Sequence, residues 1–110
     1  MTAETPVLDT LTEMTAASLE HSSLAPRELM LARIAALIAV GAPAASYLAN
    51  AEAAEDSGVT ADDIQGVMVA VAPVAGTAKV VSAGGNILKA FGFAIAVADS
   101  ELADDPDAVE

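Results

Sequence analysis

The order of apolar and polar residues along the chain predicts helices throughout. No segment shows the two-residue alternation of a half-buried strand, and the apolar runs are long and rich in alanine. Short breaks that contain proline, glycine or serine separate about five helical segments. We therefore predict an all-α fold, a single-domain bundle of about five helices.

The first predicted helix begins at Thr5 and Pro6 and has two unlike faces. Thr5 can cap a helix, and Pro6 suits the first helical position. Five apolar side chains fall on one face: Val7, Leu8, Leu11, Met14 and Leu19. We expect this helix to pack on the body of the protein or on a neighbouring subunit, and residues 1–23 to form an N-terminal helix and linker.

The second predicted helix, from Pro26 to about Val40, is apolar nearly all round, which indicates a central position. Gly41 suits the left-handed residue that follows a helix end. Glu28 and Arg33 are the charged residues within this helix after its start. A buried unpaired arginine is costly, so we expect Arg33 to pair with Glu52, Glu55 or an acid of a partner chain, ahead of an anionic ligand.

A helix–turn–helix unit is the most specific local signal in the chain. The third predicted helix runs from about residue 43 to residue 57, and Gly58 fits the left-handed residue after it. Thr60 then caps the fourth helix, with Asp63 three residues on as a capping box. Pro73 is expected to break or kink that helix. The last helix is expected over residues 74–98, which closes a helical domain of residues 24–98, and residues 99–110 form an acidic, disordered tail.

Composition adds an expectation about assembly. Hydrophobic residues make up 55% of the 110 residues, but aromatic residues only 3%. Small side chains favour close helix–helix contacts, and a short chain leaves apolar surface uncovered. We therefore predict a homo-oligomer, a trimer or a hexamer.

The charge of the chain excludes several classes of partner. Sixteen acids and four bases give a net charge of −12, which disfavours both nucleic acids and anionic membrane surfaces. No run of about 20 apolar residues is free of charge or proline, so no membrane span is predicted. The N-terminal sequence lacks the pattern of a secretory signal, and we expect a cytoplasmic protein.

The segment from Leu24 to Leu88 resembles the carboxymuconolactone decarboxylase family, which includes the alkylhydroperoxidase D-like proteins. The motifs that carry the resemblance are "REL" at the start of a central apolar helix and "SGVTADDI" at the turn before the fourth helix. The resemblance implies an all-α fold that assembles as trimers or hexamers. In the redox-active branch, it also implies a Cys-x-x-Cys pair and a histidine on the helix before that turn.

The chain departs from that catalytic pattern. The resemblance places the histidine at Asn50 and the two cysteines at Ser46 and Pro43, and it likens Glu28 to the glutamate that assists them. The chain contains no cysteine, so peroxide reduction through a thiolate has no nucleophile here. Asn50 cannot titrate, although it can hydrogen-bond a carbonyl or a carboxylate.

Two hypotheses follow from these residues. The first is a cysteine-free, redox-inactive family member that acts as an oligomeric binding or scaffold protein for itself or for a small apolar or carboxylate ligand. The second is a non-redox lyase or isomerase in which Glu28 and Asn50 are catalytic, and Arg33, Ser46 and Tyr47 bind the substrate. Neither hypothesis predicts a cofactor or a metal, because the one histidine has no second ligand near it in the sequence.

Overall fold

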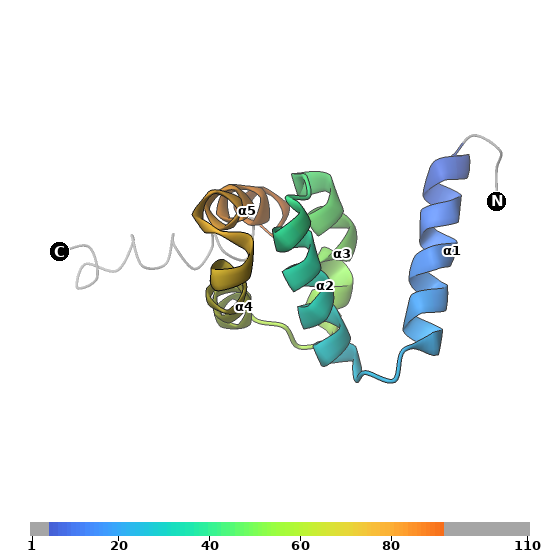
Figure 1. Cartoon of the computed structure of the whole chain (residues 1–110). Coiled ribbons are helices and arrows are strands. Elements are labelled where there is room, and N and C mark those ends of the chain that lie inside the picture. The colour runs from blue at the N-terminus through green and yellow to red at the C-terminus, as the bar shows by residue number, and fades with distance from the viewer. Residues whose placement is uncertain (1–4, 92–110) are drawn as a thin grey trace, which may run out of the picture.

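A computed structural model describes residues 5–91 of the chain, and they form five α-helices (Figure 1). The helices are α1 (Pro6–His21), α2 (Pro26–Val40), α3 (Ala44–Asp56), α4 (Ala61–Ala75) and α5 (Thr77–Ala90). No strand occurs between residues 5 and 91, so the predicted all-α fold is confirmed. The expected end of the last helix near residue 98 and the expected tail from residue 99 lie outside the described residues.

Helix α2 is the centre of the folded body, as its apolar sequence predicts. It contacts α3, α4 and α5, and α5 in turn contacts α3 and α4. The side chains of Met30, Ile34 and Ile38 are buried almost completely along it. Within the described part of the chain, the core contains ten buried apolar residues: Leu29, Met30, Ile34, Ile38, Ala42, Tyr47, Ala54, Ile64, Ala83 and Ile87. All ten come from α2 to α5 or from the turn after α2, so α1 contributes nothing to the core.

The turn between α2 and α3 depends on the glycine that the sequence indicates. Gly41 has a φ of +71°, a conformation that side chains disfavour. Its N–H donates to the carbonyl of Ile38 at 3.2 Å, and the N–H of Ala42 donates to the carbonyl of Leu37 at 3.0 Å. The side-chain amide of Asn86 on α5 donates to the carbonyl of Ala42 at 3.3 Å. These bonds satisfy the end of α2 and attach the turn to α5.

The predicted capping box at the start of α4 is confirmed. Asp63 accepts the backbone N–H of Thr60 at 2.9 Å, and the Thr60 hydroxyl accepts the backbone N–H of Asp63 at 3.1 Å. Arg27 at the start of α2 makes an ion pair with Asp63 at 2.6 Å. The Thr60 N–H, with the Thr60 side chain and Arg27, holds the pKa of Asp63 below its usual value. The cap therefore joins the beginnings of α2 and α4.

Pro73 was predicted to break or kink α4; the break is wrong, and the kink stays a prediction. Helix α4 continues past Pro73, and the chain breaks at Gly76, so the last helix begins at Thr77 instead of Val74. Pro73 lies in the last turn of α4, where its missing N–H removes one hydrogen bond but leaves the following ones in place. The N–H of Gly76 still donates to the carbonyl of Ala72 at 3.0 Å. Gly76 itself has a φ of +89°, which ends the helix.

The predicted cap at the first helix is also wrong in its chemistry. Thr5 does precede α1, but its side chain makes no capping bond to the backbone. Its hydroxyl donates instead to the Asp9 carboxylate at 3.2 Å. The ψ of Thr5 is 55°, whereas residues that cap a helix usually have an extended backbone.

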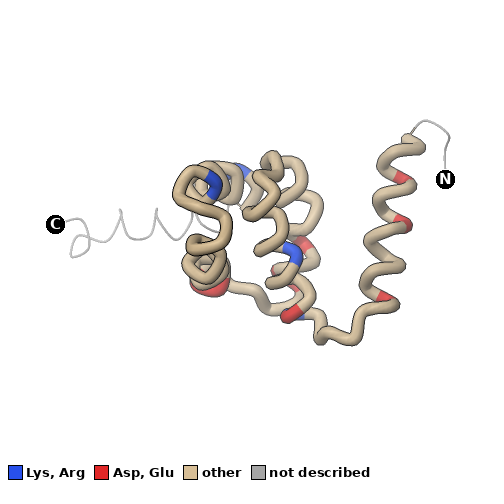
Figure 2. The backbone as a smooth tube through the Cα atoms, viewed as in Figure 1, with Lys and Arg blue, Asp and Glu red and all other residues tan. Residues whose placement is uncertain are grey.

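Helix α1 stands apart from the other four helices, on the side of α2 and α3 (Figure 1). None of its residues is buried, and its five large apolar side chains are 45–70% exposed. Figure 2 shows acidic residues along α1. The expectation that this helix packs on the body is therefore wrong, while packing on a neighbouring subunit stays a prediction. None of the helices within residues 5–91 combines the length and apolarity needed to cross a bilayer.

Candidate functional site

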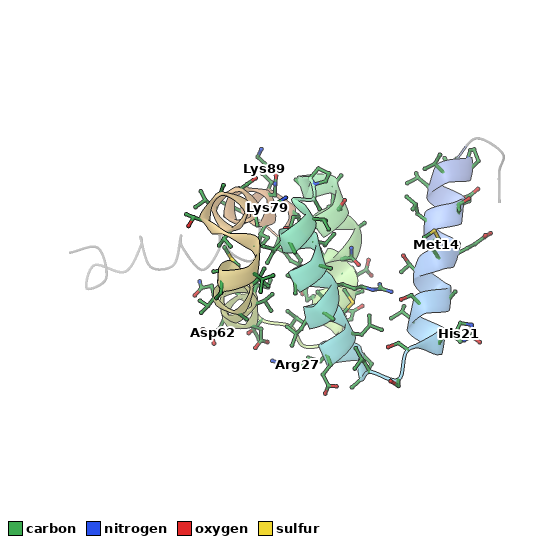
Figure 3. The ribbon with its side chains drawn as sticks, in the orientation of Figure 1. Met14, His21, Arg27, Asp62, Lys79 and Lys89 are labelled. Carbon is green, nitrogen blue, oxygen red and sulfur yellow. The ribbon has the colours of Figure 1, made fainter. Side chains whose placement is uncertain are left out.

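A hollow of about 320 Å³ lies between α1 and the pair α2 and α3, and it opens widely to solvent. Its lining comes from three helices: Met14, Thr15 and Ser18 of α1, Arg33, Ala36 and Leu37 of α2, and Asn50 of α3. Met14 can be located on α1 in Figure 3. Two of the residues singled out from the sequence, Arg33 and Asn50, therefore share one site.

Arg33 is the charged residue of this hollow. Its guanidinium donates to the backbone carbonyl of Thr15 at 3.3 Å, which is the contact that reaches across to α1. Among the described residues no carboxylate lies within ion-pair distance of it. The expected pairing with Glu52 or Glu55 is therefore wrong within one chain. Asn50 faces the hollow, and Glu52 and Glu55 are rotated away from it around α3 by about 200° and 140°. Pairing with an acid of a partner chain stays a prediction.

Asn50 is held in place by its own helix. Its side-chain nitrogen donates to the carbonyl of Ser46, one turn earlier, at 2.8 Å. This bond orients the amide and leaves its oxygen as an acceptor. Ser46 thus supports Asn50 through its backbone, and its own side chain does not line the hollow.

Glu28 lies outside the hollow. It occupies the first turn of α2, is exposed, and is absent from the lining. Five residues along a helix correspond to a rotation of about 140°, so Glu28 and Arg33 face different directions. The structure brings Arg33 and Asn50 together but does not bring the proposed acid or base to them.

Tyr47 is a core residue. Its side chain is fully buried, and its hydroxyl has no hydrogen-bond partner in the part of the chain that the structure describes. Burial raises the pKa of this phenol, because the charged form is disfavoured away from water. The ring belongs to the hydrophobic core and does not line the hollow.

The described residues offer no metal site. No group of three or more His, Cys, Asp or Glu side chains between residues 5 and 91 is placed to hold an ion. His21 lies at the end of α1, exposed (Figure 3). As far as the described residues show, the hollow thus combines apolar walls with the Arg33 cation, the Asn50 amide and two residues that carry hydroxyls, Thr15 and Ser18.

Sequence reasoning missed most of the lining of the hollow. Met14, Thr15 and Ser18 lie on the same side of α1 because residues three and four apart share a helical face. That spacing was visible in the sequence, but nothing indicated which helix this face would meet. Ala36 and Leu37 carried no signal, because their helix is apolar on almost every side.

Residues 5–89 match the family model described as the carboxymuconolactone decarboxylase family. The match covers more than half of the chain and extends from the start of α1 into the last turn of α5. No curated protein matches the chain, and no solved structure matches it. Every helix that lines the hollow thus lies within the matched region.

Proposed function

The chain belongs to the carboxymuconolactone decarboxylase family, and we propose that it is a redox-inactive member that acts as an oligomeric binding or scaffold protein. The observation that carries the proposal is the complete absence of cysteine from the 110 residues. The positions that the resemblance assigns to the histidine and one cysteine hold Asn50 and Ser46. The Asn50 side chain hydrogen-bonds the Ser46 backbone carbonyl, and the two residues supply neither a thiolate nor a titrating base.

We further propose that the hollow beside α1 takes a small carboxylate with an apolar body. Its walls at Met14, Ala36 and Leu37 are apolar, and the Arg33 guanidinium has no carboxylate partner among the described residues. A planar guanidinium binds a carboxylate through two parallel hydrogen bonds. Asn50 adds an amide that can bond a second polar group of the ligand.

A first consequence concerns peroxides. The purified protein is expected to show no peroxidase turnover with any thiol donor, because the reaction needs an attacking thiolate and a resolving thiol. The measurement is peroxide consumption against a buffer control. Turnover that persists through repeated purification would contradict the proposal.

Ligand binding gives a second test, with benzoate as the probe and benzamide as its uncharged control. At ten times its dissociation constant, benzoate should stabilise the protein by about 1.4 kcal/mol, seen as a rise in melting temperature. Arg33→Gln should abolish this rise. Lys89→Gln makes the same change of charge on the exposed end of α5 (Figure 3) and should leave it intact. Equal shifts with benzoate and benzamide, unaffected by Arg33→Gln, would argue against recognition by Arg33.

A lyase or isomerase that uses Glu28, Arg33 and Asn50 is the second candidate. The shared position of Arg33 and Asn50 in the hollow favours it. The exposed position of Glu28 disfavours it, because a general acid or base must reach the proton that it moves. Turnover of a small carboxylate or lactone that is lost in both Glu28→Gln and Arg33→Gln would establish this candidate over simple binding.

We propose a trimer or a dimer of trimers as the assembled form. The support is the large apolar surface that a single chain leaves uncovered, above all along α1. Light scattering at micromolar concentration in moderate salt tests this. A mass near that of one chain, 10.9 kDa, would refute the assembly.

A further inference from the structure

The outer surface of α4 and α5 carries a continuous apolar groove. Two hollows of about 300 and 330 Å³ adjoin there, and both are lined by Gln65 and Met68. Val69 belongs to the border on α4, and Gly84 and Leu88 to the border on α5. Among residues 5–91, Gln65 is the sole polar side chain in the lining, and no charged residue is part of it. We call this surface the α4/α5 groove.

The charge of the chain limits what can cover this groove. Each chain carries a net charge of −12, so two copies repel each other wherever their acidic surfaces meet. Acidic residues lie along α1, on α3 and at the start of α4 (Figure 2). The lining of the α4/α5 groove has no acid, and α5 contributes two lysines and no acid at all. Within residues 5–91, contact through this lining therefore places no acid of one copy directly against an acid of the other.

We propose that the α4/α5 groove packs against the same groove of a second copy, related by a twofold axis. The proposal deepens the proposed self-association and rests on it. Gln65 and Met68 line both halves of the groove, so they lie near its middle, where a twofold axis would bring the two Gln65 side chains together. An amide both donates and accepts, so each Gln65 satisfies its copy across the axis.

Gly84 keeps the groove open for this contact. A Cβ atom at Gly84 would lie 3.5 Å from the Cε atom of Met68 across the groove. Without a side chain there, the surface of the second copy can approach the backbone of α5, and dispersion contacts accumulate. The neighbouring Gly85 is exposed and does not line the groove, and no atom of the described residues lies within 4 Å of a Cβ placed there.

The size of the groove predicts a contact of modest strength. Helices of 15 and 14 residues are about 22 and 21 Å long. Two helices that are each about 10–12 Å in diameter and pack about 8–10 Å apart are together about 20 Å wide. The face is therefore on the order of 500 Å², below the ~800 Å² per partner of a standard interface. The contact should dissociate on dilution and strengthen with salt, because salt screens the repulsion between the acidic chains.

A matched pair of glycine variants tests the contact in the full chain. Gly84→Leu fills the groove, whereas Gly85→Leu makes the same substitution one residue away on the same helix. Light scattering should show that Gly84→Leu halves the wild-type mass and that Gly85→Leu leaves it unchanged. A twofold contact joins copies in pairs, so its loss halves the mass of a dimer and of a dimer of trimers alike.

A surface variant guards against a folding defect in Gly84→Leu. Gln65 is exposed in the single chain, so Gln65→Lys should fold normally. It lowers the net negative charge and so reduces the overall repulsion, yet it places two like charges at the proposed axis. It should therefore also halve the mass.

The outcomes separate this inference from the proposed function. A wild-type mass of one chain would overturn both. If the wild type is an oligomer and neither Gly84→Leu nor Gln65→Lys changes its mass, the twofold contact alone is overturned. This holds also if Gly84→Leu shifts the melting temperature without changing the mass, because the groove would then be covered by the same chain. If a variant reduces an assembly of more than two chains to single chains, the twofold contact is also overturned, because the contact that the variant blocks would then join more than pairs of chains.

Discussion

Replacing Ile34 with alanine is expected to lower the free energy of unfolding by about 3 kcal/mol, within the range of 2–5 kcal/mol for such truncations. Ile34 is fully buried in α2, the helix that contacts α3, α4 and α5. The change removes apolar contacts and leaves a cavity that the packed neighbours cannot fill. Small domains are stable by about 5–15 kcal/mol, so a large part of the stability is lost. Urea denaturation measures the change.

Leu11→Ala is the matched control for this truncation. It removes an aliphatic side chain of the same size from a helix, but Leu11 is 50% exposed on α1. We expect a loss below about 1 kcal/mol, because little apolar surface returns to water. A loss at Leu11 as large as that at Ile34 would contradict the separation of α1 from the body. Measuring the unfolding free energies of both variants at several protein concentrations would show whether a second copy covers α1.

Two substitutions of Tyr47 are expected to change stability in opposite directions. Tyr47→Ala should lower the free energy of unfolding by about 3–5 kcal/mol, since it empties the space of a fully buried ring. Tyr47→Phe should raise it by about 1 kcal/mol, since it keeps the ring and removes a hydroxyl that is buried without a partner among the described residues. A Tyr47→Phe variant less stable than the wild type would show that the hydroxyl is bonded in solution.

The free energies of unfolding of the wild type and of Tyr47→Phe should depend differently on pH. Burial raises the pKa of Tyr47 in the folded state, whereas the unfolded chain releases this proton near pH 10. Above that pH the unfolded state binds fewer protons than the folded state, so stability falls as pH rises. The contribution of the neutral Tyr47 phenol to the free energy of unfolding is fully present below about pH 10, and it is lost as the pH rises through the higher pKa of the folded state.

Tyr47→Phe isolates this contribution. Both proteins contain the same lysines, so the difference between their unfolding free energies removes the other groups that titrate in this range. The advantage of Tyr47→Phe should be constant below about pH 9 and should grow above about pH 10. A constant difference through pH 11 would contradict the buried position of the phenol.

The helices and their turns could be predicted because their signals are local. Gly41 and Gly58 both have positive φ, and Thr60 and Asp63 form their reciprocal cap within three residues of each other. Such chemistry acts between neighbours in the chain and needs no knowledge of the rest of the fold. The break predicted at Pro73 was wrong because the free-energy cost of a proline in a helix depends on how far the helix continues beyond it. That length is decided by the packing of the following residues.

The candidate site was only partly predictable. Arg33 and Asn50 were singled out from the sequence, one as a charge within an apolar helix and the other by family resemblance. That they line one hollow depends on how α3 lies against α2 and on where α1 stands. Tyr47 carried no sign of burial, because the alanines around it suit a core and a surface equally well.

The sequence by itself determined the helical class, the central place of α2, the turn chemistry and the lack of a thiol nucleophile. Each follows from residue type, periodicity or short spacing. Only the tertiary structure decided that α1 stays off the core, that Glu28 lies outside the hollow shared by Arg33 and Asn50, and that, within residues 5–91, an apolar groove without acids runs along α4 and α5. The physical reason is that these are relations between helices, and an apolar, alanine-rich sequence allows its helices to pack on several faces with similar energy.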